Sequence, residues 1–99
     1  MAEGLILEFA GSTLATYRAV SEKLGMDTTN PKADWPAGLR FHAAGSTGAG
    51  FLVFEVWDSR DAQDRFMQIR LGPALQAGGS PQPTRMEWIT LAAHTIPAA

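Results

Sequence analysis

The sequence predicts an α+β fold in which one four-stranded antiparallel sheet carries two helices on one face. Two observations predict it. Short apolar runs that suit strands alternate with two stretches in which apolar residues recur at helical spacing. The elements follow in the order strand, helix, strand, strand, helix, strand, which a single sheet with both helices on one side accommodates economically. At 99 residues we expect one ferredoxin-like domain spanning residues 1–99.

The first half of the chain predicts a strand, a helix and a loop. Residues 5–9 are apolar and bounded by glycines, which is typical of a buried strand. Ser12 or Thr13 can cap a helix that ends at Gly25. Its apolar stripe consists of Leu14, Tyr17, Val20 and Leu24. Residues 26–37 contain two prolines and are expected to form a loop, in which Trp35 is either a packing anchor or part of a lid over a site.

The second half predicts a hairpin, a helix and a last strand. Residues 39–44 and 51–57 suit strands, and the glycine-rich residues 45–50 suit the tip between them. Asp58 or Ser59 can cap a helix that Gly72 and Pro73 should end, with one further turn through Leu75 as the alternative. The last strand is expected from about Arg85 to Ala93.

Pairing Gly45 with Gly50 divides the hairpin into two unlike faces. One face is wholly apolar and should pack on the helices: Leu39, Phe41 and Ala43 opposite Val56, Phe54 and Leu52. The other face is mixed, with Arg40, His42 and Ala44 opposite Glu55, Val53 and Phe51, and Trp57 at the end. We expect the helices to leave this mixed face uncovered, so that it forms either an interface with a second copy or the lining of a ligand cavity.

The mixed face supplies the candidate catalytic residues. His42 can act as a general base near neutral pH, with Glu55 placed diagonally to orient it and Arg40 placed to keep Glu55 ionised. The alternative is a structural polar cluster that fixes the register at a dimer interface. The candidate walls for a planar substrate are aromatic, and each has core packing as its alternative: Trp57, Phe51, Trp88 and Trp35.

Composition excludes several other classes of function. The net charge is -2, without the clustered basic face that nucleic-acid binding needs. The two histidines, His42 and His94, lack a helical metal-binding spacing and there is no cysteine, so we expect no metal. The glycines of residues 45–50 lack the Lys-Ser/Thr end of a phosphate loop. No apolar run suits a membrane helix and the N-terminal residues do not resemble a signal peptide, so a cytoplasmic protein is expected.

Several segments together resemble a known family. They are residues 8–11, 38–45, 56–60 and 71–75, with Phe66 and His94. The chain is similar to the small bacterial proteins of the dimeric α+β barrel superfamily that are like antibiotic biosynthesis monooxygenases. The resemblance implies a homodimer that closes over the second sheet face.

The resemblance also implies handling of a small aromatic or polyketide-type molecule. The corresponding activity is that of a cofactor-independent monooxygenase, a cyclase or an isomerase. The alternative is a non-catalytic, stress-related or ligand-binding module whose sheet face serves only as a dimer interface. Haem-degrading relatives place an axial histidine on the second helix, and residues 60–70 contain none, so no haem or other cofactor is expected.

Overall fold

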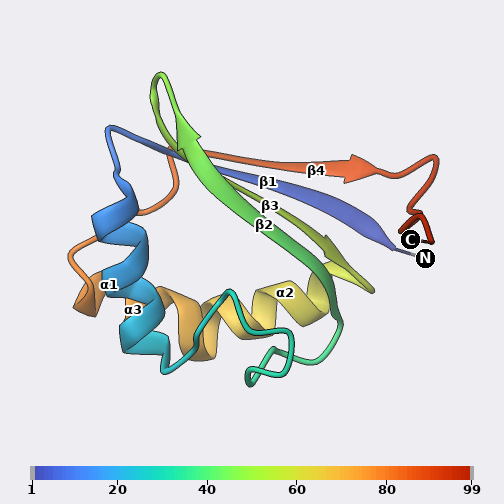
Figure 1. Ribbon diagram of the computed structural model, residues 1–99, viewed down its shortest axis with the longest axis horizontal. Coiled ribbons are helices and arrows are strands. Elements are labelled where there is room, and N and C mark those ends of the chain that lie inside the picture. Colours follow the sequence, from blue (N-terminus) through green and yellow to red (C-terminus); the bar gives the residue numbers. More distant parts are fainter. Residues whose placement is uncertain (1, 99) are drawn as a thin grey trace.

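A computed structural model describes residues 2–98 as one sheet covered by helices on one side (Figure 1). The strands lie in the order β2-β3-β1-β4, with every neighbouring pair antiparallel. This arrangement confirms the predicted ferredoxin-like α+β fold. The elements are β1 (Glu3–Ala10), α1 (Leu14–Leu24), β2 (Leu39–Thr47), β3 (Gly50–Trp57), α2 (Arg60–Phe66), a π-helical turn η1 (Met67–Leu71), α3 (Gly72–Ala77) and β4 (Arg85–Thr90). No helix within residues 2–98 is long and apolar enough to cross a bilayer.

The predicted helix caps are confirmed. The side chain of Thr13 accepts a hydrogen bond from the backbone N–H of Thr16 at the start of α1. Gly25 ends α1 in the left-handed conformation, with φ of 73°, which glycine adopts without steric cost. Ser59 caps α2 in the same way as Thr13 caps α1, through the N–H of Ala62.

The second helix does not end at Gly72 and Pro73 but continues to Ala77, two residues beyond the alternative end at Leu75. A proline ring inside a regular helix clashes with the carbonyl four residues earlier. Here the π-helical turn widens the helix instead, because the N–H of Gly72 donates to the carbonyl of Met67, five residues back. Glycine suits this turn, since a Cβ at position 72 would lie 2.7 Å from that carbonyl oxygen. The helix then continues as α3, whereas β4 ends at Thr90 instead of Ala93.

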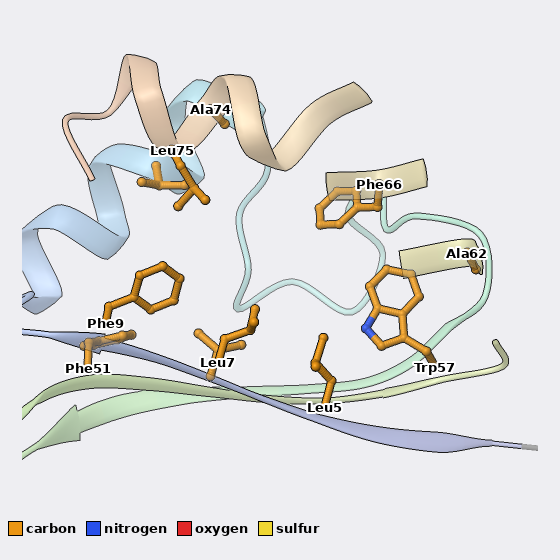
Figure 2. Close-up of a cluster of buried hydrophobic side chains, with 11 residues drawn as sticks. Leu5, Leu7, Phe9, Phe51, Trp57, Ala62, Phe66, Ala74 and Leu75 are labelled. Carbon is orange, nitrogen blue, oxygen red and sulfur yellow. The ribbon is translucent and has the colours of Figure 1, made fainter. Parts of the chain in front are cut away.

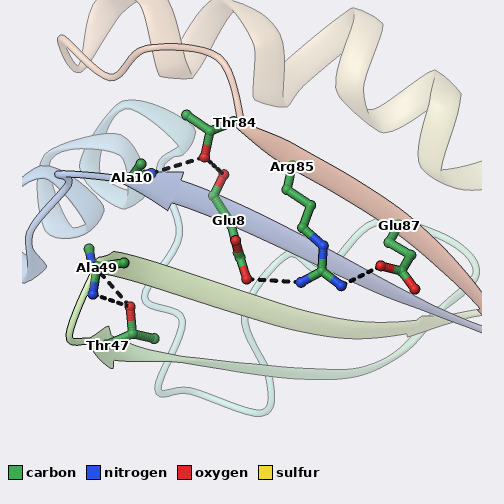
Figure 3. Close-up of polar contacts among 8 residues, drawn as sticks. Glu8, Ala10, Thr47, Ala49, Thr84, Arg85 and Glu87 are labelled. Carbon is green, nitrogen blue, oxygen red and sulfur yellow. Dashed lines mark hydrogen bonds and ion pairs between the residues drawn. The ribbon is translucent and has the colours of Figure 1, made fainter.

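The hairpin register differs from the prediction by two residues. Thr47, not Gly45, pairs with Gly50, and Gly48 and Ala49 form the tip. The Thr47 hydroxyl holds the tip by accepting from the N–H groups of Ala49 and Gly50 (Figure 3). Side chains of a strand alternate between the two faces of the sheet. A register shift of two residues therefore leaves the side chains from Phe41 onward on their predicted faces. It also brings His42 directly opposite Glu55 rather than diagonal to it.

The predicted orientation of the hairpin is wrong, because its mixed face packs on the helices. Figure 2 shows side chains of β1 and β3 pointing toward the helices. The core they form consists of Leu5, Leu7, Phe9, Phe51, Val53 and Trp57 from the sheet with Val20, Ala62, Phe66, Ala74 and Leu75 from the helices. The wholly apolar set lies on the open face instead, where Phe41 is 39% exposed although Val56 is only 2% exposed. Leu39 is the exception, since a bulge between Leu39 and Phe41 returns it to the core.

The open face also carries charge along β1 and β4. Thr84 fixes β4 to β1 through hydrogen bonds with the backbone of Glu8 and Ala10 (Figure 3). Arg85 then pairs with the carboxylates of Glu8 and Glu87. Glu8 stands opposite both Arg85 and Leu52 in the sheet, so these charges border the apolar residues of β2 and β3 on the open face.

Candidate functional site

A small cavity lies between the inner face of the sheet and the helices. Its volume is about 70 Å³. Apolar side chains from β1, α1, β3 and α3 form most of its walls, among them Phe9, Val20, Phe51 and Leu75. Figure 2 shows Phe9 and Phe51 facing Leu75 across this part of the interior.

One wall of the cavity carries a continuous series of hydrogen bonds. Nδ1 of His42 lies 2.9 Å from Oε2 of Glu55, whose Oε1 accepts from the indole N–H of Trp57 at 3.0 Å. Nε2 of His42 lies 2.7 Å from the Tyr17 hydroxyl. That hydroxyl donates to Oγ1 of Thr28 at 2.8 Å. The series therefore connects β3, β2, α1 and the loop that follows α1.

The series explains how a carboxylate is tolerated inside the core. The side chains of His42 and Glu55 are only 13% and 6% exposed. A buried polar group destabilises the fold unless it is hydrogen-bonded, and here each carboxylate oxygen has a donor. The inner face is thus mixed in composition yet satisfied in its hydrogen bonds.

Tyr17 is held in its protonated form. Burial is the main cause that raises the pKa of the Tyr17 phenol above 10.0, and the negative charge of Glu55 raises it further, while the hydrogen bond with Thr28 partly opposes the shift. At neutral pH Tyr17 is therefore a hydroxyl that donates one proton, not a phenolate.

The single hydroxyl proton of Tyr17 links the two ends of the series. When both ring nitrogens of His42 carry protons, His42 donates to Glu55 and to Tyr17, and Tyr17 donates onward to Thr28. When His42 is neutral and donates from Nδ1 to Glu55, Nε2 becomes an acceptor that attracts the Tyr17 proton or the proton of a ligand. The arrangement can therefore take up or release a proton at Nε2, which faces α1.

A larger groove adjoins the cavity on its solvent side. It lies between α1 and β2, and its volume is about 630 Å³. Tyr17, Thr28, His42 and Phe51 border both spaces. The contact between Tyr17 and His42 thus lies where the cavity, which is itself only partly enclosed, meets the open groove.

The loop between α1 and β2 covers His42. Trp35 lies with its ring centroid 5.3 Å from that of His42, and its indole N–H donates to the carbonyl of Asn30. Arg70, from the π-helical turn, donates to the carbonyls of Asp34 and Leu24. Trp35 also lines the cavity, so the loop forms part of its wall.

The predicted site residues divide into those that meet at the cavity and those that do not. His42, Glu55, Phe51 and Trp35 line it. Trp57 is fully buried and reaches the site only through its hydrogen bond to Glu55.

Two predicted residues and one further histidine lie elsewhere. The predicted contact of Arg40 with Glu55 is wrong, because beside the bulge Arg40 pairs at 2.6 Å with Asp58 and is largely exposed. Trp88 packs against the edge of the core under Arg60, whose guanidinium carbon is 5.2 Å from its ring centroid, and is not among the cavity residues. His94 is exposed in the segment after β4.

The sequence interpretation missed Tyr17 and Thr28 as members of the site. Tyr17 was assigned to the apolar stripe of α1 only, although a buried tyrosine hydroxyl requires a hydrogen-bond partner. That requirement was the available signal. Within residues 2–98, no group of three or more His, Cys, Asp or Glu side chains is placed to hold a metal ion.

Comparisons with known proteins identify the fold. No protein-family model matches the chain. No curated protein matches it either. A solved structure from Chloroflexus aurantiacus, provisionally named an antibiotic biosynthesis monooxygenase, is 12% identical with a TM-score of 0.64, covering 98% of this chain and all of the other (100%). A protein of unknown function from Nitrosomonas europaea is 21% identical with a TM-score of 0.62, covering 99% and 94% of the two chains. The chain therefore has the ferredoxin-like fold of antibiotic-biosynthesis-monooxygenase-like proteins, at identities that show the fold alone.

Proposed function

We propose that the protein binds an apolar small molecule in the cavity and moves a proton to or from it through His42. The observation that carries this proposal is the series Glu55–His42–Tyr17 in the wall of an otherwise apolar cavity. A neutral imidazole whose Nδ1–H is held by a carboxylate is suited to general base catalysis, because its Nε2 lone pair is fixed in direction. The covering loop limits access of water to that nitrogen.

The proposed reaction is of the cofactor-independent monooxygenase type on an aromatic or polyketide-type substrate. His42 removes the proton of an acidic hydroxyl, and the resulting anion is oxidised by molecular oxygen. For a simple phenol, one O₂ yields one quinone and one water, so that the substrate itself supplies all four electrons. The name given to the structure from Chloroflexus aurantiacus favours this reaction class. The same base would serve a cyclase or isomerase, in which the anion attacks a carbonyl of the same molecule or is reprotonated at another atom.

The second candidate function is binding without turnover. A stress-related or other ligand-binding module would use the same cavity, and His42 would then only fix the orientation of the ligand. The alternative in which the polar cluster of His42 and Glu55 forms a dimer interface is not favoured, because both side chains face the helices and not the open face.

Oxygen uptake with a series of hydroxylated aromatic compounds, and no added cofactor, tests the catalytic proposal. The decisive variant is His42→Asn, because the asparagine amide can still donate to Glu55 but cannot take up a proton. We expect it to lower the rate by about 10²- to 10⁴-fold. The matched control is His94→Asn, which changes the only other histidine of the chain and should leave the rate unaltered.

The outcomes separate the two candidates. Equal rates in both variants and the parent protein would exclude His42 as the base. Binding of a compound without any oxygen uptake or product would favour the non-catalytic module.

We also propose that two copies associate through the open sheet face. Phe41 and Ala43 are exposed there beside the half-buried Leu52 and Phe54, and Phe41 lies edge-on to Phe54 with ring centroids 6.2 Å apart. A face of this kind suits a second copy of the same chain, because the charged border of Glu8, Arg85 and Glu87 contains both signs. Light scattering should give a dimer for the parent protein and for Leu14→Lys on α1, and a monomer for Phe54→Lys. A monomeric parent protein at micromolar concentration would contradict this proposal.

A further inference from the structure

We infer that Tyr17 passes the proton from the substrate to His42, so that the hydroxyl of Tyr17, and not the imidazole, contacts the substrate. This inference rests on the proposed function: it keeps His42 as the base and assigns the residue that stands between the base and the substrate. Three observations carry it. They are the contacts of the His42 ring, the sizes of the two adjoining spaces and the position of the Tyr17 hydroxyl.

Both ring nitrogens of His42 are already in contact with other side chains. Nδ1 lies 2.9 Å from Oε2 of Glu55, and Nε2 lies 2.7 Å from the Tyr17 hydroxyl. The Tyr17 ring stacks on the imidazole with 18° between their planes, and the Trp35 ring lies 5.3 Å away. The His42 side chain is only 13% exposed. A substrate that touched Nε2 directly would therefore have to displace Tyr17 first.

The sizes of the two spaces place most of a substrate outside the cavity. A cavity that holds benzene has a volume of about 150 Å³. The cavity here has about 70 Å³, whereas the adjoining groove has about 630 Å³. An aromatic substrate therefore lies mainly in the groove, where Met26 and Phe51 provide apolar wall. Because Tyr17 borders both spaces, its hydroxyl lies between a substrate in the groove and Nε2 of His42.

The Tyr17 hydroxyl can receive one proton while it gives up another. It donates to Oγ1 of Thr28 at 2.8 Å, and rotation about its C–O bond turns the same proton to Nε2 of His42 at 2.7 Å. In the step, the O–H bond of the substrate hydroxyl breaks and an O–H bond forms at the Tyr17 oxygen. The former O–H bond of Tyr17 breaks as an N–H bond forms at Nε2. The electron pair stays on the substrate oxygen, and no oxidant enters before the reaction with molecular oxygen.

Both charges that the step creates have a stabilising neighbour. The imidazolium of His42 pairs with the carboxylate of Glu55. The substrate anion accepts a hydrogen bond from the re-formed Tyr17 hydroxyl, and it lies in the groove open to solvent instead of in the apolar cavity beside Glu55. Tyr17 itself never becomes a phenolate, in keeping with the burial that raises its pKa above 10.0.

A double-mutant cycle on the rate of oxygen uptake tests this inference, with phenol, hydroquinone and 1-naphthol as probes and the full-length protein. The variants are Tyr17→Phe, His42→Asn and the two combined. We expect Tyr17→Phe to lower kcat by about 10²- to 10⁴-fold, as His42→Asn does, because the phenyl ring leaves a gap that the proton cannot cross. The combined variant should be no slower than the slower single variant, since the two residues act as one unit.

The control for lost stability is Ser59→Ala. It removes the hydroxyl that caps α2, away from the cavity and the groove, and lowers stability to a comparable extent. It should keep the rate of the parent protein. A loss of rate in Ser59→Ala equal to that in Tyr17→Phe would overturn the inference, because stability alone would then explain both.

The other outcomes separate the inference from the proposed function. If His42 took the proton directly, Tyr17→Phe would uncover Nε2 and leave the rate unchanged or raised, which would overturn the role of Tyr17 and leave His42 as the base. A further full loss on adding His42→Asn to Tyr17→Phe would do the same. An unchanged rate in His42→Asn, or no oxygen uptake by the parent protein with any probe, would overturn the proposed function and the inference with it.

Discussion

Removal of one oxygen atom, in Tyr17→Phe, tests whether the hydrogen-bonded series stabilises the fold. The variant keeps the aromatic ring and its stacking on Phe51, and it loses the contacts of the hydroxyl with His42 and Thr28. Each net hydrogen bond contributes about 0.5–1.5 kcal/mol. Because the site is only partly closed, water compensates some of the loss, and we expect the free energy of unfolding to fall by about 1–2 kcal/mol.

Urea unfolding followed by tryptophan fluorescence measures this change. For a domain of this size, a loss of about 1 kcal/mol lowers Tm by about 4–8 °C, so Tyr17→Phe should melt about 4–16 °C below the parent protein. Protein concentration must be equal in both samples, since association would add to the apparent stability. The control is Thr29→Val, which removes an exposed hydroxyl of the same loop that contacts only Asp27. Equal destabilisation by the two variants would refute the argument.

The pH dependence gives a second, independent measurement. The pKa of Tyr17 is raised in the folded protein, so the folded state binds this proton more tightly than the unfolded chain does. The corresponding stability is fully present below the unfolded pKa of about 10 and is lost as pH rises through the higher folded pKa. Tyr17 is the only tyrosine of the chain, so ultraviolet absorbance of tyrosinate reports it directly. A native titration midpoint at or below 10.0 would contradict the burial argument.

Two further predictions concern the buried carboxylate and the π-helical turn. Glu55→Gln should lower the free energy of unfolding by about 1.5–3 kcal/mol, because the amide NH₂ group then faces the donor of Trp57 or His42. Glu87→Gln on the surface should change this free energy by less than about 0.5 kcal/mol, and urea unfolding of both variants measures the difference. Gly72→Ala should be destabilising by about 1–3 kcal/mol, because its Cβ would lie 2.7 Å from the carbonyl oxygen of Met67. A Cβ at Gly45 would have no atom within 4 Å, so Gly45→Ala should be close to neutral when both variants are compared by thermal melting.

The sequence allowed the order of elements and both helix caps to be predicted, because these depend on local patterns. Thr13, Ser59 and Gly25 act within one turn of their own helix, and no distant partner decides their role. Gly72 and Pro73 were misinterpreted for the complementary reason. A helix stop is the usual consequence of Gly-Pro, but the packing of α3 on α1 and on the core stabilises a continued helix through a wider turn.

The orientation of the hairpin could not be predicted, because both of its faces are rich in apolar residues. The presence of Glu55 and His42 suggested that their face avoids the core. Each of these polar groups alone is unfavourable in a core, but together they are satisfied, because Tyr17 of α1 and Trp57 of the same strand provide their partners. The sequence of a hairpin does not show which side chain of another element will form hydrogen bonds with it. Here that side chain is Tyr17 of α1.

The reversed orientation separates two roles that the sequence placed on one surface. The inner face holds the cavity and the hydrogen-bonded series, and the open face holds the apolar residues around Phe41, with the border of charges around Arg85. Side chains that project to opposite faces of a sheet do not contact each other, so substitutions on the two faces should have additive effects. Phe54→Lys should therefore change association without altering the rate of oxygen uptake, and His42→Asn should lower that rate without altering association. Loss of oxygen uptake in a folded Phe54→Lys monomer would instead show that the second copy completes the cavity.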